Sequence, residues 1–334
     1  MLDISKISYK VYLIRENGEQ LNLTDIVSDA SWQENEGEIA MRVSVSLANI
    51  FYNGKRISSL AKPNCYIVIT AENEGKSAEV ARAKITEWSP QISGENNVIR
   101  LEGYDELYDL QSSQDNRYIA SGVTTKAAIL SICKDWGIPI STYNGPINKN
   151  AKTIFKNEFL SDIILELLAN AHKHGANRCI VRASKGKISV LPRAGNTTVY
   201  AFEEGLNLET VNYKISTGEM VTVVKVVATE TKNKRQKVEA IVKGKTQYGK
   251  RQRIYVRQHD DSLASAKSAA KQILSDEGQP IETLSVQAPD VPYIRRGDKV
   301  KLSCWVYTGY AVIESIQHDV KGRSMTMKLS KFKA

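Results

Sequence analysis

A pattern of turns and short strands occurs near both ends of this 334-residue chain, and it constrains the fold more than any other feature. Each copy has a basic turn, a strand, a hairpin, a second strand, a polar turn and a last strand. The first copy occupies residues 61–101 and the second residues 295–329. The hairpins carry Gly75 and Gly309 at corresponding places. A meander repeated in this way predicts two similar antiparallel β domains.

The region around the first copy contains further strand signals and lacks long helical patterns. Residues 9–14 are mostly apolar and lead to Asn17-Gly18, a strong hairpin signal. Residues 40–47 alternate between apolar and polar side chains, as in a half-buried strand. Further strands are expected at residues 66–70, 80–88 and 97–102. Short strands at this spacing predict a sandwich or a barrel.

The middle of the chain has a different character. Residues 124–136 and 159–171 have the 3.6-residue apolar period of helices, and they stop at Gly137 and before Gly175. Residues 178–191 follow as a hairpin around Gly186. Helix, helix and hairpin together predict a small α+β module.

The last third is again rich in strands, with one alanine-rich helix. Residues 221–229 and 237–243 are expected to form a long hairpin, and residues 262–274 a helix whose small apolar face suits packing on a sheet. The predicted fold is therefore mainly β with an α+β insert, in which two similar antiparallel β-barrel domains flank a helix-helix-hairpin module. The predicted domains are a first barrel at 1–115, the α+β module at 116–200, and a second barrel with the alanine-rich helix at 201–334.

This order of parts resembles a known family. The hairpin end at residues 186–192, the Gln-Tyr-Gly at 247–249, and the Arg-Gly-Asp and Thr-Gly-Tyr at 296–298 and 308–310 all fit the arrangement. The chain is similar to the baseplate hub proteins of contractile phage tails, which include late control D-type proteins and the hubs of PBSX-like prophages. The resemblance covers essentially the whole chain and rests on arrangement rather than on a catalytic motif.

The resemblance implies a structural protein rather than an enzyme. Such hubs form homotrimers in which two barrels per chain give a ring of six, matching a sixfold tail tube on one side and a threefold spike on the other. The implied partners are the tail tube or a tube-adaptor protein, the spike, the tape measure and the baseplate wedge proteins. The implied location is the baseplate of a phage-like tail particle that is assembled in the bacterial cytoplasm.

The formal net charge of +9 is unevenly distributed and leaves a second interpretation open. Residues 1–110 carry −6, whereas residues 111–200 and 201–334 carry +7 and +8. Opposite charges on the two barrels suit contacts around a ring. A basic loop is a candidate partner-binding site, formed by Lys232, Lys234, Arg235, Lys237, Arg251 and Arg253. The alternative functions are a basic nucleic-acid-binding protein, although aromatic side chains are sparse near this loop, and a cell-wall hydrolase component of the tail.

No catalytic, cofactor or metal signature is found in the sequence. The four cysteines are far apart and form no CxxC pair, and His172 and His174 lack the spacing of zinc ligands on a helix. The alternating Glu34, Glu36 and Glu38 are expected in a solvated loop. No nucleotide-binding glycine motif or long apolar run occurs, so we expect no cofactor, no metal and no membrane span.

Overall fold

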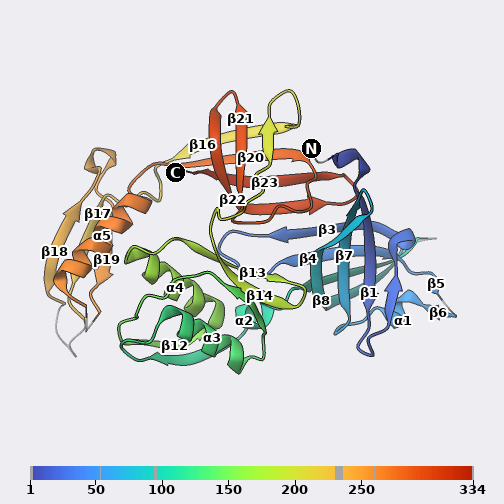
Figure 1. Cartoon of the computed structure of the whole chain (residues 1–334), viewed down its shortest axis with the longest axis horizontal. Helices are drawn as coiled ribbons and strands as arrows, with labels where there is room; N and C mark the ends of the chain where they lie inside the picture. Colours follow the sequence, from blue (N-terminus) through green and yellow to red (C-terminus); the bar gives the residue numbers. More distant parts are fainter. Residues whose placement is uncertain (1–2, 53, 94–95, 230–235, 259–260, 333–334) are drawn as a thin grey trace.

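The computed structural model describes residues 3–52, 54–93, 96–229, 236–258 and 261–332. As the sequence predicted, the chain is mostly β, with large antiparallel sheets and few helices. Figure 1 shows the first barrel in blue on the right and the second in red above it, with the α+β module in green below.

The first barrel encloses one hydrophobic core. Alternation places Val43, Val45 and Leu47 of one strand inward and its polar residues outward. The outermost strands of its order, β2-β1-β7-β8-β9-β4-β3, supply Leu21 and Trp32 to that same core, so the sheet curls round on itself. Its strands are β1 (Ser8–Ile14), β2 (Gln20–Asn22), β3 (Val27–Glu34), β4 (Arg42–Ala48), β7 (Tyr66–Asn73), β8 (Lys76–Ser93) and β9 (Asn96–Tyr104). A 3-10 turn, η2 (Thr24–Ile26), precedes β3, and the small elements β5 (Phe51–Tyr52), β6 (Lys55–Arg56) and α1 (Ile57–Leu60) lie between β4 and β7.

The second barrel is built in the same way around a second core. Its order is β15-β21-β22-β23-β20-β16, and Phe202 of β15 packs into the same core as Val211 of β16 at the other end. Its strands are β15 (Ala201–Glu203), β16 (Thr210–Ser216), β20 (Ile281–Pro289), β21 (Lys299–Cys304), β22 (Tyr307–Asp319) and β23 (Ser324–Lys331). An N-terminal 3-10 turn, η1 (Ile4–Lys6), contributes Ile4 to both cores.

The repeat predicted from the sequence is present in the structure. The antiparallel meander β7-β8-β9 corresponds to β21-β22-β23, and the long middle strand of each carries a register shift, after Ile85 in β8 and after Ile313 in β22. The preceding turns also correspond. Ile85 exchanges backbone hydrogen bonds with residues 64 and 65, and Ile313 exchanges them with residues 297 and 298. Asn64 and Gly297 both have positive φ, 72° and 85°, so even the turn geometry repeats.

The two barrels are joined edge to edge. The end of β22 pairs with β3 in antiparallel register, with His318 opposite Trp32, which makes one continuous 13-stranded sheet. Figure 1 shows β3 and β22 side by side where the barrels meet.

The α+β module packs around its own core below the barrels. The predicted helices are present as α3 (Thr125–Asp135) and α4 (Leu160–Lys173), and the predicted hairpin as β13 (Cys179–Ser184) and β14 (Lys187–Pro192). Thr124 caps α3 by accepting a hydrogen bond from the Ala127 N–H. The remaining elements, which the sequence did not indicate, are α2 (Tyr108–Ser112), β10 (Gln114–Ile119), β11 (Ile140–Tyr143) and β12 (Thr153–Phe159).

A small three-stranded sheet forms a separate lobe at the far left of Figure 1. The predicted hairpin is present as β17 (Val223–Val227) and β18 (Val238–Lys243), and β19 (Gln252–Val256) runs parallel to β17. The alanine-rich helix α5 (Leu263–Glu277) packs Ala266, Ala270 and Ile273 against this sheet, as predicted. A short 3-10 turn, η3 (Thr246–Tyr248), precedes β19. Within the described residues, no helix has the length and apolar character needed to cross a membrane.

Candidate functional site

The junction of the two barrels contains a buried ion pair. Glu34, at the end of β3, is 2% exposed and accepts two hydrogen bonds from the Arg295 guanidinium, at 2.8 and 3.1 Å. The backbone N–H of Arg296 donates a third hydrogen bond to Glu34, at 3.2 Å. Both arginines belong to the turn that precedes β21, so one carboxylate of the first barrel fixes a loop of the second.

The electrostatic environment keeps Glu34 charged. Burial by itself would raise the pKa of Glu34, but the positive charge and hydrogen bonds of Arg295, together with Arg182 and Arg296, outweigh burial and hold this pKa at about 2. A bidentate arginine–carboxylate pair of this kind fixes geometry as well as charge.

The same loop is held from a third side by the α+β module. Arg182 of β13 donates from Nε to the Arg296 carbonyl at 2.9 Å and from Nη2 to Asp298 Oδ1 at 2.6 Å. Arg295 Nη1 donates to the Ala183 carbonyl at 2.6 Å. The loop at residues 295–298 is therefore the point where both barrels and the module meet.

A second polar cluster crosses the junction beside the ion pair. The His318 ring is fully buried, stacks on Trp32 with ring centroids 4.5 Å apart, and places Nδ1 2.6 Å from Asp290 Oδ1. The Tyr9 hydroxyl of the first barrel donates to the other oxygen of Asp290. Burial raises the pKa of Tyr9, and the charge of Asp290 raises it further, so this hydroxyl stays a donor.

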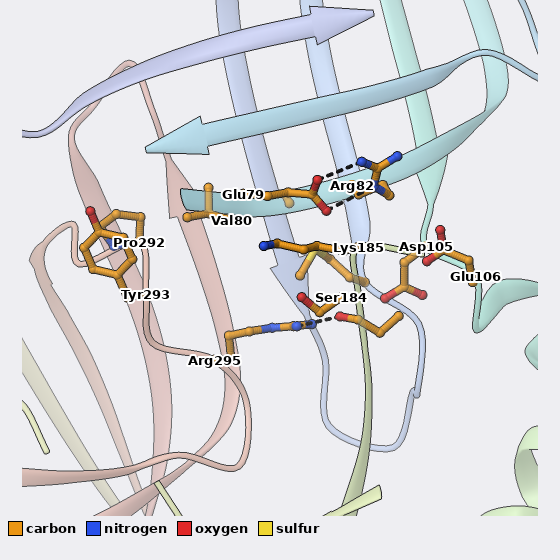
Figure 2. A pocket seen from close by; sticks show the side chains of 13 residues that line it. Glu79, Val80, Arg82, Asp105, Glu106, Ser184, Lys185, Pro292, Tyr293 and Arg295 are labelled. Atoms are coloured by element: carbon orange, nitrogen blue, oxygen red, sulfur yellow. Dashed lines mark hydrogen bonds and ion pairs between the residues drawn. The ribbon is translucent and has the colours of Figure 1, made fainter. Parts of the chain in front are cut away.

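A cavity of about 140 Å³ opens next to the loop (Figure 2). Glu79 and Arg82 of β8 form an ion pair along one wall, and Arg295 lies opposite. The tip of the β13–β14 hairpin, at Ser184 and Lys185, reaches into the space between them.

Asp105 is the buried carboxyl of this cavity. It follows β9, is buried, and accepts one hydrogen bond from the Leu107 N–H, while its Oδ2 atom has no partner within the described residues. Burial raises the pKa of Asp105 to about 7, although Arg295 acts in the opposite direction.

The cavity mixes charges of both signs and lacks an arrangement that we can assign to a reaction. Its carboxyls come from Glu79, Asp105 and Glu106, of which Glu79 is already paired with Arg82. Across the described ranges, no group of three histidine, cysteine or acidic side chains is placed to hold a metal ion. The chemistry that the junction does supply is fixation of three parts of the chain by buried, hydrogen-bonded charges.

The predicted basic loop is only partly described by the structure. Lys232, Lys234 and Arg235 lie outside the described residues. Lys237 is exposed just before β18, whereas Arg251 and Arg253 lie at the opposite end of the small sheet, since β18 runs antiparallel and β19 parallel to β17. Arg253 forms an ion pair with Glu277 of α5.

The prediction of a solvated loop was wrong for Glu34. Glu36 pairs with Lys328 at the surface and Glu38 accepts a hydrogen bond from Asn35, but Glu34 is the buried partner of Arg295. The three carboxylates therefore do not converge. The histidines at the end of α4 face α5: His172 lies 2.7 Å from the Ala176 carbonyl and 3.2 Å from Asp276, and His174 lies 3.2 Å from the Ser265 hydroxyl.

The residues that the sequence did not indicate are Glu34 with Arg295, and His318 with Asp290 and Tyr9. Arg295 is 261 residues from Glu34, so no local spacing connects them. The alternation of small and large apolar residues in β3, at Ala30 and Trp32, was the available signal for the strand that carries Glu34.

The fold is that of phage tail proteins of known structure. The chain matches the 43 kDa tail protein of prophage MuSo2 from Shewanella oneidensis with a TM-score of 0.70 and 11% identity, over 96% of this chain and 98% of that one. It matches a tail protein from Neisseria meningitidis MC58 with a TM-score of 0.72 and 13% identity, over 97% of both chains. It matches prophage tail protein gp18 from Listeria monocytogenes EGD-e with a TM-score of 0.63 and 15% identity, over 97% of this chain and 95% of that one. At these identities the fold is what is shared.

The family follows from a sequence match. The model of the YQBQ-like family matches residues 78–330, and the chain belongs to this family. A search of curated proteins found no match.

Proposed function

We propose that this protein is the structural baseplate hub of a contractile phage-like tail, assembled as a homotrimer. The observation that carries the proposal is the repeat of one barrel within one continuous sheet, joined edge to edge through β3 and β22. One chain thereby offers two similar units, and three chains offer six. A symmetry adaptor between a sixfold tube and a threefold spike needs this combination.

The shared fold with three tail proteins supports the same role. A further match is a component of the type VI secretion system from E. coli, described as structurally similar to tail proteins gp27 and gp5 of bacteriophage T4, with a TM-score of 0.57 and 10% identity. The match covers 92% of this chain and 74% of that one. Other matches are Francisella PdpA-VgrG complexes. The proposed partners are accordingly the tail tube or its adaptor, the spike, the tape measure and the wedge proteins, within a tail particle assembled in the cytoplasm.

The proposed role is assembly rather than catalysis. The buried charges at the junction are used in ion pairs that hold the barrels and the module together, as Glu34 and Arg295 do. The first barrel supplies the acid and the second the base at both Glu34–Arg295 and Glu36–Lys328, which agrees with the opposite charges of the two regions.

Co-expression with the neighbouring tail proteins, followed by native mass measurement, tests this proposal. We expect a complex that contains three copies of this chain. A single copy in the assembled complex, or retention on DNA that falls with salt while no tail protein is bound, would contradict it. Turnover of peptidoglycan would favour the hydrolase alternative.

A further inference from the structure

In each barrel two strand edges are of the kinds used at the internal junction, which takes only one of them from each barrel. Within the described residues the outer sides of β2 and β15 are also unpaired, but they have no counterpart at that junction. In the first barrel, β3 is paired with β22, while the far end of β8, residues 87–93, pairs with β9 on one side only. In the second barrel, β22 is paired with β3, while β16 pairs only with β20. In the described part of the chain no strand covers these two remaining edges. Unpaired edges of this kind are templates for another strand.

The repeat shows that the two unpaired edges, on β8 and β16, correspond to the two edges that pair at the internal junction, on β22 and β3. Counting from the register shift, Trp88 of β8 corresponds to Ile316 of β22, because they pair with Leu101 and Met327 at equivalent rungs. Counting through the neighbouring strands, Tyr213 of β16 corresponds to Trp32 of β3. Each strand of the internal junction thus has a counterpart in the other barrel: β8 corresponds to β22 and β16 corresponds to β3. The strands β22 and β3 pair with each other within the chain, whereas β8 and β16 each leave the corresponding edge unpaired.

We propose that residues 87–93 of one copy pair in antiparallel register with β16 of the next copy, in the way that β22 pairs with β3 within the chain. The occupant of each open edge is a second copy of this chain, and the inference rests on the proposed homotrimer. The rungs follow from the internal junction, where Ile316 lies opposite Glu34 and His318 opposite Trp32. The predicted rungs between copies are Trp88–Ile215, Ser89–Lys214, Pro90–Tyr213 and Gln91–Asn212.

Exposed apolar side chains lie at the predicted contact. Trp88 is 37% exposed and Ile215 is 59% exposed, and the proposed register places them directly opposite one another. Their counterparts at the internal junction, Ile316 and Glu34, are each 2% exposed. Pairing would therefore cover the exposed parts of two large apolar side chains.

The next rung has matching chemistry. At the internal junction His318 stacks on Trp32, and between copies the ring of Pro90 would face Tyr213. Pro90 also removes one backbone donor from the edge, a common feature of edge strands that must not pair indiscriminately.

The charges on the outer face are complementary. Lys214 is exposed and would lie opposite Ser89, diagonal to the exposed Glu87. Opposite charges at diagonal positions stabilise neighbouring strands modestly. The acid again comes from the first barrel and the base from the second.

The barrels of the proposed ring are joined head to tail. Each barrel gives a β3-type strand to one neighbour and a β22-type strand to the other, so the contact is heterologous and repeats until it closes. A ring built in this way alternates junctions within a chain and junctions between chains.

Disulfide trapping tests the register. The double variant Gln91→Cys/Asn212→Cys, co-expressed with the neighbouring tail proteins and oxidised after assembly, should give covalent dimers and trimers on a non-reducing gel, with the trimer as the largest species. The matched control Gln91→Cys/Ser216→Cys places the second cysteine about 13 Å further along the strand and should not cross-link. Each single variant controls for the four native cysteines, of which Cys65 and Cys133 are buried.

The outcomes separate the two proposals. A three-copy complex without cross-links, or with equal cross-linking in both double variants, would overturn the strand pairing and leave the hub proposal standing. No self-association of the wild-type chain in the presence of its neighbours would overturn both.

Discussion

The two open edges and the closed junction share one geometry but differ in what fills it. At the closed junction, Glu34 accepts hydrogen bonds from Arg295 and Arg296, and His318 stacks on Trp32 with its Nδ1 against Asp290. At the open edges the corresponding positions carry Ile215 and Pro90, which need no partner of opposite charge. In the proposed ring, the closed junction forms once, within a folding chain, whereas the open edges stay exposed to water until the copies assemble.

This difference indicates why two similar barrels carry different side chains at their two kinds of junction. A buried charge pair costs desolvation and gives specificity, and it suits a contact whose partners are covalently linked. An apolar contact between exposed side chains can form and dissociate without leaving a buried charge unpaired. Substitutions at the two kinds of junction test this contrast, first through assembly and then through the stability of the single chain.

Ile215→Asp should weaken assembly and leave the stability of the single chain unchanged. A carboxylate placed opposite Trp88 would be desolvated without a partner, and we expect self-association to weaken roughly 30-fold or more. Analytical ultracentrifugation of the co-expressed complex measures the strength of self-association. Ile241→Asp is the matched control, because Ile241 is 54% exposed on β18 of the small sheet. Equal losses in both variants would contradict a specific role for the β16 edge.

Glu34→Ala should have the largest effect on the stability of the monomer. Arg295, which is largely shielded from water, would lose the carboxylate to which it is hydrogen-bonded, and such a loss typically costs about 3–5 kcal/mol. Urea unfolding measures the loss. Glu36→Ala removes the partner of Lys328 at the surface and should cost about 0–1 kcal/mol. Similar losses for both would show that burial of the Glu34 pair does not matter.

Asp105→Asn should change the pH dependence of stability. The folded-state pKa of Asp105 is about 7, above the ordinary value of 3.8, so the folded state binds more protons between these values. This group therefore lowers wild-type stability progressively from about pH 4 to pH 7, by about 1.4 kcal/mol for each unit of pKa difference, and the effect is constant above pH 7. The variant should gain stability relative to the wild type across that range. Parallel curves of unfolding free energy against pH would contradict this.

Tyr9→Phe should have a small effect at the same junction. It removes the hydrogen bond from Tyr9 to Asp290 but leaves the contact between Asp290 and His318 in place. We therefore expect the free energy of unfolding to fall by about 1 kcal/mol. Thermal unfolding measures it. Tyr12→Phe is the control on the same strand, because in the described part of the chain its hydroxyl has no partner. A loss no larger than that of the control would exclude a role for Tyr9 in joining the barrels.

Sequence patterns predicted the parts of the fold that depend on local periodicity. The meander repeat, the two helices of the module, its hairpin and the alanine-rich helix are all confirmed, since each has its own apolar period or turn residues. The domain limits at 115 and 200 and the binding role of the basic loop stay predictions.

The contacts between distant parts were beyond such reasoning. Both strands of the β3 type, β3 and β16, were missed, because each has only three apolar residues among seven or eight, which makes their alternation weak as a sequence signal. Glu34 was assigned to a solvated loop because it alternates with Glu36 and Glu38 in a polar stretch, while its partner Arg295 lies in the second barrel. When a carboxylate is buried by a partner that is distant in the sequence, the residues next to it do not indicate its burial.

Imaging of the assembled baseplate by electron cryomicroscopy tests the central claim most directly. The account predicts three copies of this chain in a closed ring of six barrels, in which β22–β3 junctions within chains alternate with β8–β16 junctions between chains. A ring of six copies, a single copy, or barrels that meet through other strands would contradict it.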